Sequence, residues 1–274
     1  MKILAGPARM FSRLMLWLNI LRNVIGVTSK TQLGLFLSAL IDISFHMAGS
    51  SLAALPRVYV SGIICAKSYG IYFYVRALSD DLYSVMPERE GDVNEAILNF
   101  LKEGDVFIDV GANIGYYSIL AGKIVGERGR VISVEPIPSS SEVLNLNIKL
   151  NRSNNVTVIQ KAAWNSNEII NMHIPKGFFG LASIYESQNA TDLLTVEGVP
   201  LDEILRASKV DFLKIDAEGS EYQILEGAKE TLKKTKYIIL EASARKDEII
   251  CFLKKMGFKI RKLKFTTYIF AYKN

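Results

Sequence analysis

The sequence predicts a doubly wound α/β domain with a mainly parallel sheet, preceded by a helical and hairpin extension. From Val106 onward, short apolar runs typical of buried strands alternate with segments whose apolar residues recur at helical spacing. Repeated units of this kind form parallel sheets with right-handed crossovers. The last two strand-like segments have no helix between them, which predicts one antiparallel strand near the C-terminus.

The predicted strands are short and rich in Val, Ile, Phe and Tyr. In chain order they are Val106 to Ile108, Val131 to Val134, Val156 to Ile159, Phe212 to Ile215, Tyr237 to Leu240, Lys259 to Lys264 and Tyr268 to Tyr272. Helices are predicted between them, the first beginning after Gly115 and the last ending at Gly257. Ser139 and Glu142 have capping-box spacing, which predicts the start of the helix after the second strand.

Changes of pattern divide the chain into three predicted segments. Residues 1–56 form two or three apolar helices, and residues 57–104 form short strands or a hairpin with a linking helix over Asn94 to Leu101. Residues 105–274 form the α/β domain. Ligands of such domains bind at the carboxyl ends of the strands, so candidate site residues are sought there.

Composition narrows the classes of function. The chain has 274 residues, 49% of them hydrophobic and 22% charged, which fits a globular protein. Cys65 and Cys251 match no zinc or disulfide pattern, and no metal site is predicted. With only His46 and His173 present, a carboxylate or lysine is expected as any general base. The sequence of the α/β domain shows no basic patch interleaved with aromatic residues, so no nucleic-acid partner is expected.

The basic excess lies at the N-terminus, where five cationic residues precede the first acidic residue, Asp42. The apolar runs Leu14 to Leu21 and Leu33 to Ile41 are shorter than the ~20 residues that a spanning helix needs. The run from Met10 to Val27 lacks a small-residue cleavage site of a signal peptide. We therefore expect a cytoplasmic protein whose first 56 residues either contact a membrane peripherally or pack against the α/β domain.

The strongest functional motif, DVGANIG from Asp109 to Gly115, stands where the first strand turns into the first helix. Gly111 and Gly115 let the backbone turn tightly and approach a ligand, and the helix N-terminus offers free N–H donors. A dinucleotide fingerprint has glycine where Asn113 stands, so the loop favours the amino-acid end of S-adenosylmethionine over pyrophosphate. The predicted cofactor-binding residues here are Asp109, Gly111, Ala112, Asn113 and Gly115.

Two further cofactor contacts are predicted at strand ends. Glu135 ends the second strand and is followed by Pro136, and a carboxylate in this place accepts hydrogen bonds from ribose hydroxyls. Nicotinamide enzymes use the same arrangement, so this motif does not distinguish the two cofactors by itself. Ala163, just after the third strand, is small enough to admit the adenine ring. Glu135, Pro136 and Ala163 are therefore predicted to bind the cofactor.

The third motif, KIDAEGSE from Lys214 to Glu221, stands at another strand-to-helix turn on the same sheet edge. Asp216 ends the strand, where it is predicted both to bind the cofactor and to act in catalysis. Glu218 and Lys214 are predicted to orient or deprotonate an acceptor hydroxyl. Glu221 is interpreted as an acidic residue that favours a helix N-terminus electrostatically.

The three motifs occur in one order: DVGANIGYYS from Asp109, Glu135-Pro136, and KIDAEGSEYQILEGA from Lys214. In these residues the chain resembles the FkbM-family methyltransferases over about Asn94 to Asn274. The resemblance implies a Rossmann-like class I methyltransferase domain with a seven-stranded sheet over residues 105–274. It also implies S-adenosylmethionine as cofactor and O-methylation of a hydroxyl on a sugar, glycan, lipid or secondary metabolite. The chain departs from many relatives at Glu241-Ala242-Ser243, where a histidine is expected.

Two alternatives come from other classes of function. A nicotinamide-dependent oxidoreductase uses the same topology, although Asn113 spoils its fingerprint. A non-catalytic scaffold with a degenerate cofactor fold would associate with a membrane or a complex through residues 1–56. Loss or retention of cofactor binding distinguishes these alternatives from the methyltransferase, whose expected partner is a small-molecule or glycan acceptor.

Overall fold

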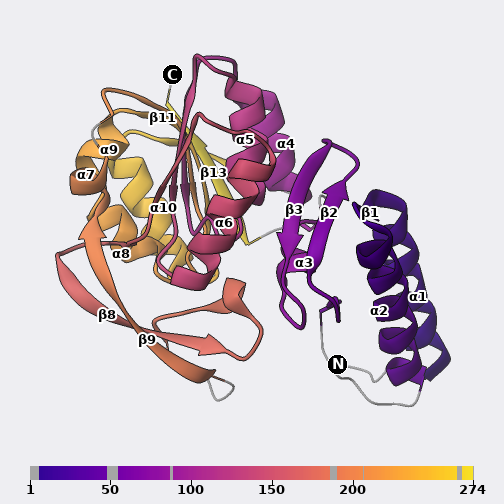
Figure 1. Cartoon of the computed structure of the whole chain (residues 1–274). Helices are drawn as coiled ribbons and strands as arrows, with labels where there is room; N and C mark the ends of the chain where they lie inside the picture. The colour runs from indigo at the N-terminus through magenta and orange to yellow at the C-terminus, as the bar shows by residue number, and fades with distance from the viewer. Residues whose placement is uncertain are drawn as a thin grey trace. The chain divides into compact units, whose positions relative to one another are not determined.

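The computed structural model describes residues 6–47, 55–86, 89–185, 190–205, 207–263 and 267–273 (Figure 1). The chain forms two compact units, Met1–Arg89 and Glu90–Asn274. Part of the terminal strand predicted over Lys259 to Lys264 lies outside the described residues. The predicted three-segment division at residues 56 and 104 stays a prediction.

The first unit combines two long helices with a small antiparallel sheet in the order β1-β2-β3. Its elements are α1 (Gly6–Asn23), β1 (Val24–Gly26), α2 (Ser29–Met47), β2 (Gly62–Ala66), β3 (Ile71–Val75) and α3 (Asp81–Ser84). β2 and β3 form the predicted hairpin. β1 lies in a region predicted as helical; it pairs with β2, with Val24 opposite Ala66, and this tertiary pairing explains why the local pattern did not reveal it.

A buried ion pair joins α1 to α2. Arg13 and Trp17 of α1 both donate side-chain hydrogen bonds to the carboxylate of Asp42 on α2. All three side chains are buried, so the only acidic residue of the two helices is neutralised inside the unit. Within the described part of the chain, no helix has both the length and the apolar character needed to cross a membrane.

The second unit is built on a seven-stranded sheet in the order β12-β13-β11-β10-β4-β5-β6. Its strands are β4 (Val106–Val110), β5 (Arg130–Val134), β6 (Val156–Ile159), β10 (Val210–Ile215), β11 (Thr235–Glu241), β12 (Lys259–Lys262) and β13 (Tyr268–Tyr272). Parallel pairing joins β11 to β10, β10 to β4, β4 to β5 and β5 to β6. In contrast, β13 runs antiparallel to both β11 and β12. This is the predicted class I methyltransferase sheet, and its antiparallel strand confirms the prediction from the helix-free C-terminal pair.

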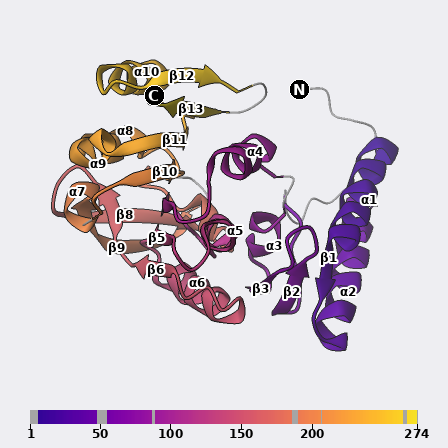
Figure 2. The same ribbon diagram turned by 90° about the horizontal axis from the view of Figure 1, so that it is seen from above.

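Strand alternation places two different cores on the two faces of the sheet. Phe107, Phe212 and Phe270 lie on one face, where Phe100 of α4 stacks on Phe270 with ring centroids 4.9 Å apart. Their strand neighbours, such as Leu213, pack on the other face in a cluster with residues of α7, α8, α9 and α10. Figure 2 shows helices on both faces of the sheet, as a doubly wound fold requires.

The helices of this unit follow the predicted positions with small shifts. They are α4 (Gly91–Phe100), α5 (Tyr116–Val125), α6 (Pro138–Leu150), α7 (Leu201–Ile204), α8 (Glu221–Glu226), α9 (Lys229–Lys233) and α10 (Lys246–Lys255). The predicted capping box at Ser139 is wrong: α6 begins two residues earlier than that box implies, with Ile137 as its N-cap and no side-chain cap. Pro138 starts the helix because its fixed φ suits the first helical position.

A second, smaller sheet has the order β7-β9-β8. Its strands come between β6 and β10 in the chain, and this sheet was not predicted. It consists of β7 (Ala162–Trp164), β8 (Glu168–Pro175) and β9 (Ala190–Pro200), with the 3₁₀ helix η1 (Phe179–Leu181) in the connection. Figure 1 shows the β8–β9 hairpin extending below the central sheet. This hairpin supplies one wall of the candidate site.

Candidate active site

The glycine motif forms the turn between β4 and α5. Gly111 and Gly115 adopt positive φ angles of 73° and 93°, and Asn113 also lies in the left-handed region at 49°. Asp109 is fully buried at the end of β4, where its Oδ2 accepts a 2.6 Å hydrogen bond from Ser118 of α5. Asp109 thus fixes the loop from below.

Gly111 brings the first and third motifs into contact. A Cβ at Gly111 would lie 1.7 Å from the backbone oxygen of Asp216. No residue with a side chain fits there without moving the end of β10 or the loop. The close approach therefore depends on glycine, and it sets the two motifs side by side at the carboxyl ends of β4 and β10.

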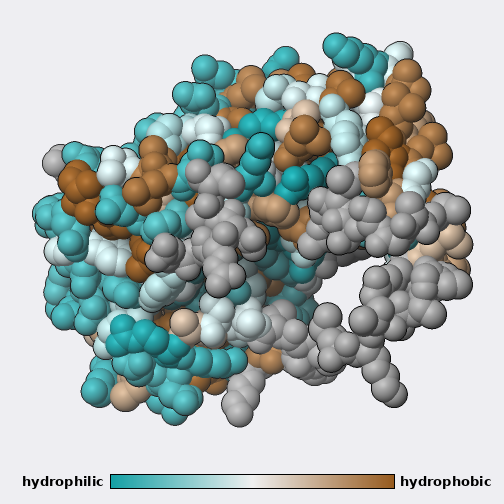
Figure 3. All heavy atoms as spheres, turned by 90° about the horizontal axis from the view of Figure 1, so that it is seen from below, coloured by the Kyte–Doolittle hydropathy of each residue, from teal (hydrophilic) through white to brown (hydrophobic). Residues whose placement is uncertain are grey.

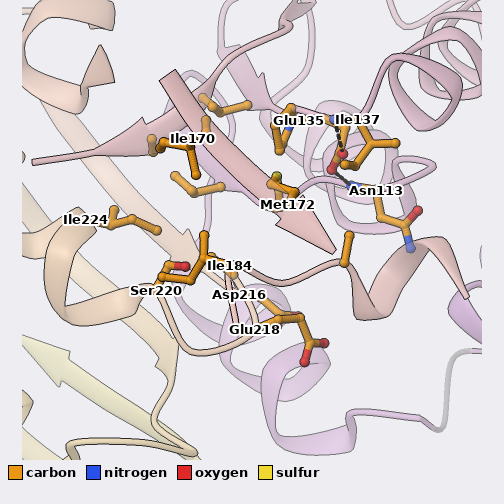
Figure 4. Close-up of a pocket in the computed structure, with 18 of the residues that line it drawn as sticks. Asn113, Glu135, Ile137, Ile170, Met172, Ile184, Asp216, Glu218, Ser220 and Ile224 are labelled. Carbon is orange, nitrogen blue, oxygen red and sulfur yellow. Dashed lines mark hydrogen bonds between the residues drawn. The ribbon is translucent and has the colours of Figure 1, made fainter. Parts of the chain in front are cut away.

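Glu135 is tied to the glycine loop by its carboxylate. Oε2 accepts a 2.8 Å hydrogen bond from the backbone N–H of Asn113, and Oε1 accepts a 2.9 Å bond from that of Ile137 (Figure 4). A carboxylate oxygen has two lone pairs and can accept more than one hydrogen bond. Pro136 follows Glu135 and also lines the pocket, so the structure brings the first two motifs together.

A pocket of about 620 Å³, partly open to solvent, lies over these strand ends. Glu135 stands at one side of it and Asp216 and Glu218 at the other (Figure 4). Between them the wall is apolar and includes Ala163 and Met172. The remaining apolar side chains of that wall are Val110, Val134, Ile137, Ala162, Trp164, Ile170, Phe179, Ala182, Ile184, Ala217 and Ile224.

This lining fits S-adenosylmethionine in its chemistry. A carboxylate for ribose hydroxyls, an apolar slot for a purine and a glycine loop at a helix N-terminus are all present. Of the predicted cofactor residues, Gly111, Asn113, Glu135, Pro136, Ala163 and Asp216 line the pocket, whereas Asp109, Ala112 and Gly115 shape the loop behind it.

Lys214 is buried beneath the pocket and not exposed within it. Its side chain is 2% exposed, and its Nζ lies 3.4 Å from Oδ1 of Asp109 and 3.4 Å from Oδ2 of Asp216. The ammonium also lies 5.0 Å from the ring centroid of Tyr117. Lys214 therefore lies between two strand-end carboxylates, below the pocket that it was predicted to act in.

Asp216 has a second partner on β13, the antiparallel strand beyond β11 in the sheet. The hydroxyl of Tyr268 donates a 2.9 Å hydrogen bond to its Oδ2. Glu218, two residues further, adopts a φ of 48° and is half-buried at the pocket edge. The tight turn between these two acids brings their carboxylates close together at the pocket.

Glu221 supports this turn from inside. Its Oε1 accepts hydrogen bonds from the backbone N–H groups of Ala217 at 3.1 Å and Gly219 at 3.2 Å. Burial raises the pKa of Glu221 above its ordinary value, although these backbone hydrogen bonds act in the opposite direction. The side chain stabilises the turn at the start of α8, which agrees with its interpretation from sequence.

Glu241, at the end of β11, lies close to Asp216 and Glu218. The carboxylate oxygens of Asp216, Glu218 and Glu241 lie within 4.8 Å of one another. Burial, followed by the negative charge of Asp216, raises the pKa of Glu241 to about 7. Glu241 was not among the predicted catalytic residues. Its position at a strand end next to β10 is the signal that points to it once the strand order is known.

The comparisons with known proteins agree with this geometry. Residues 109–260, more than half of the chain, match the methyltransferase FkbM domain family. The hexuronic acid methyltransferase AglP of Haloferax volcanii is 25% identical over 182 residues, which cover 66% of this chain and 74% of that protein. Protein-L-isoaspartate O-methyltransferase 1 of Archaeoglobus fulgidus is 39% identical over 59 residues, only 22% of this chain and 27% of that protein.

Among solved structures, an S-adenosylmethionine-dependent methyltransferase from Aquifex aeolicus aligns with a TM-score of 0.44 and 19% identity. The alignment covers 72% of this chain and 97% of that one.

Proposed function

The chain belongs to the methyltransferase FkbM domain family and is an S-adenosylmethionine-dependent methyltransferase; from that premise we propose that it methylates a hydroxyl group of a sugar or glycan. The observation that carries the proposal is the group of three carboxylates, Asp216, Glu218 and Glu241, at one end of the pocket. Bound S-adenosylmethionine supplies an electrophilic methyl group on a sulfonium.

The proposed cofactor site extends between the first and third motifs. Glu135 would accept hydrogen bonds from the ribose hydroxyls, and the apolar wall that includes Ala163 would hold the purine. The loop of Gly111 to Gly115, with backbone N–H groups at a helix N-terminus, would hold the carboxylate of the amino-acid end. Asp216, on the same pocket, would stabilise the positive charge of the sulfonium.

The charge of the site favours a hydroxyl acceptor over a carboxylate. Three acidic side chains close together repel a carboxylate that approaches the reacting methyl group. A hydroxyl can instead donate a hydrogen bond to one of them. AglP is named a hexuronic acid methyltransferase, and we extend only its sugar class to this chain. A hexuronic acid would then react through a hydroxyl, with its carboxylate directed away from the acids.

Proton removal is assigned to the same carboxylates. Asp216 or Glu218 would accept the proton of the hydroxyl as its oxygen forms a bond to the methyl carbon and the sulfur–methyl bond breaks, with the thioether S-adenosylhomocysteine as the leaving group. Glu241, whose pKa is raised to about 7, takes part in proton uptake near neutral pH. Lys214 lies between Asp109 and Asp216 and holds them in place. Most of the acceleration comes from alignment of the acceptor with the methyl group.

Transfer of a labelled methyl group tests the proposal. The purified protein is incubated with methyl-labelled S-adenosylmethionine and a panel of hexuronic acids, neutral sugars and oligosaccharides. Label in a sugar that survives mild alkali is a methyl ether and supports the proposal. Label released by alkali is a methyl ester and contradicts the choice of hydroxyl.

Variants locate the chemistry. Asp216→Asn should lower turnover at least 100-fold, the typical contribution of general-base catalysis, whereas the exposed Asp247→Asn on α10 should leave it unchanged. Calorimetric titration of S-adenosylmethionine against Glu135→Ala should show weakened binding, with the exposed Glu142→Ala of α6 as control. Folded wild-type protein that binds no cofactor would favour the scaffold alternative.

A further inference from the structure

Among the described residues of the first unit, α1 and α2 carry large apolar side chains that are exposed. On α1, Phe11, Leu14, Met15 and Leu18 are exposed, with exposed fractions between 39% and 63%. Their spacing of three and four residues puts them on one side of the helix. The opposite side, with Trp17 and Ile20, is almost completely buried.

The second helix repeats the same pattern. Leu33, Phe36, Leu37 and Leu40 of α2 have exposed fractions between 45% and 63% and the same spacing. Figure 3 shows hydrophobic residues gathered at the right-hand edge of the molecule, over α1 and α2. Two stripes of large exposed apolar side chains, one on each helix, are unusual on the surface of a monomeric protein. They indicate an interaction site.

The charges around these stripes have one sign. Residues 1–79 hold eight Lys and Arg residues and a single acid, Asp42, whereas the rest of the chain holds 25 cations and 27 acids. Asp42 is buried against Arg13 and Trp17, so it does not offset the cations outside. Arg22, at the end of α1, and Lys30, at the start of α2, are exposed at the ends that the short β1 connects.

Lys67 adds a third exposed cation at this end. Its Nζ donates a 2.8 Å hydrogen bond to the backbone oxygen of Arg22. The helical pair therefore presents exposed apolar stripes along its length and cations at one end, with no acidic side chain on either exposed stripe. This is the composition of an interfacial helix, which buries apolar side chains among lipid tails and sets Lys and Arg at the headgroups.

We propose that α1 and α2 dock the protein on an anionic lipid bilayer, lying in its interface through the two apolar stripes. Membrane crossing is not required, because apolar stripes and flanking cations suffice for interfacial binding. A second copy of the chain is a less favourable binding partner for the α1–α2 surface, since two surfaces with the same positive charge repel each other. The inference does not depend on the identity of the methyl acceptor.

Vesicle co-sedimentation with the full chain tests the proposal. Vesicles of phosphatidylcholine with phosphatidylglycerol are compared with pure phosphatidylcholine vesicles at low and high salt. Wild-type protein should bind the anionic vesicles, less strongly at high salt. Lys30→Ala should weaken this binding about fivefold, the effect of one cation near an anionic surface.

A double variant and a matched control distinguish binding through α1 and α2 from nonspecific binding of the protein to vesicles. Leu18→Glu with Leu40→Glu places two charges on the stripes and should abolish binding. Ile169→Glu with Leu193→Glu changes two equally exposed apolar residues of β8 and β9, with exposed fractions of 67% and 62%, and should leave vesicle binding intact. Unchanged S-adenosylmethionine affinity in both double variants shows that the catalytic unit remains folded.

Three outcomes overturn the proposal. Absence of wild-type binding to anionic vesicles at low salt contradicts it, and so does equal binding by the Leu18→Glu, Leu40→Glu variant. Light scattering that shows a wild-type dimer, a monomeric double variant and no vesicle binding by either would assign the stripes to self-association.

Discussion

Lys214 and Asp109 are direct neighbours across the parallel β10–β4 pair, with Nζ 3.4 Å from Oδ1 in a fully buried setting. The pair links the strand ends that carry the first and third motifs. A buried charge that loses its partner is strongly destabilising, by about 3–5 kcal/mol. We expect a loss of this size in the free energy of unfolding of Lys214→Met, measured by chemical denaturation.

The double variant Asp109→Asn, Lys214→Met provides the control for this pair. It removes both charges, so it should be more stable than Lys214→Met alone. Equal stability of the single and double variants would show that the unpaired charge of Asp109 does not lower the free energy of unfolding.

The pKa of Glu241 predicts a dependence of stability on pH. In the folded protein this pKa is raised to about 7, whereas an unfolded chain has a glutamate pKa of about 4.3. Between these values the folded state holds a proton that the unfolded state releases, so the contribution of Glu241 to stability falls as pH rises through this window. The charges that face it are Asp216, Glu221 and Glu90.

Glu241→Gln removes the titration. Its melting temperature relative to wild type should therefore be higher at pH 8 than at pH 5, where the wild-type side chain is already protonated. Glu142→Gln, an exposed change on α6, should show no such trend. A difference between Glu241→Gln and wild type that does not vary with pH would contradict the raised pKa.

Gly111 and Gly104 form a matched pair for the glycine loop. Both have positive φ angles, 73° and 83°, but a Cβ meets the backbone of Asp216 only at Gly111 and nothing within 4 Å at Gly104. Gly104→Ala should cost about 1–2 kcal/mol, the penalty of the left-handed conformation alone. Gly111→Ala should cost more and should also weaken S-adenosylmethionine binding in calorimetry. Equal losses in both variants would mean that the close approach has no energetic consequence.

Local patterns predicted the fold well because buried parallel strands are short and apolar. β6 has the predicted bounds, and the helix-free C-terminal pair correctly indicated an antiparallel strand. The glycine motif and Glu135 were found because both stand at strand ends, and the structure joins them through the N–H of Asn113. These contacts follow from positions that the sequence marks directly.

Other parts depend on tertiary pairing that a single sequence does not display. β8 and β9 have exposed faces and a long connection, so their pattern did not separate them from a loop. Glu241 meets Asp216 and Glu218 only because β11 is the neighbour of β10. The partner of Asp216 on β13, Tyr268, is 52 residues away in sequence.

Tyr268 offers the most specific test of the proposed catalytic role of Asp216. Its hydroxyl donates a 2.9 Å hydrogen bond to Oδ2 of Asp216, and Tyr268 is only 7% exposed. A hydrogen bond to a charged group contributes about 1.5–3 kcal/mol, and 1.36 kcal/mol corresponds to a tenfold change in rate. Tyr268→Phe should lower kcat at least tenfold while the acceptor KM changes little, because Asp216 stays in place through Lys214 but loses its orientation.

Tyr272→Phe, at the other end of β13, is the matched control and should retain wild-type kcat. Because Tyr272 shares the strand but not the carboxylate, equal losses in the two variants would assign the effect to the packing of β13. A fall in kcat confined to Tyr268→Phe, with unchanged S-adenosylmethionine affinity, would tie the orientation of Asp216 to the transfer step.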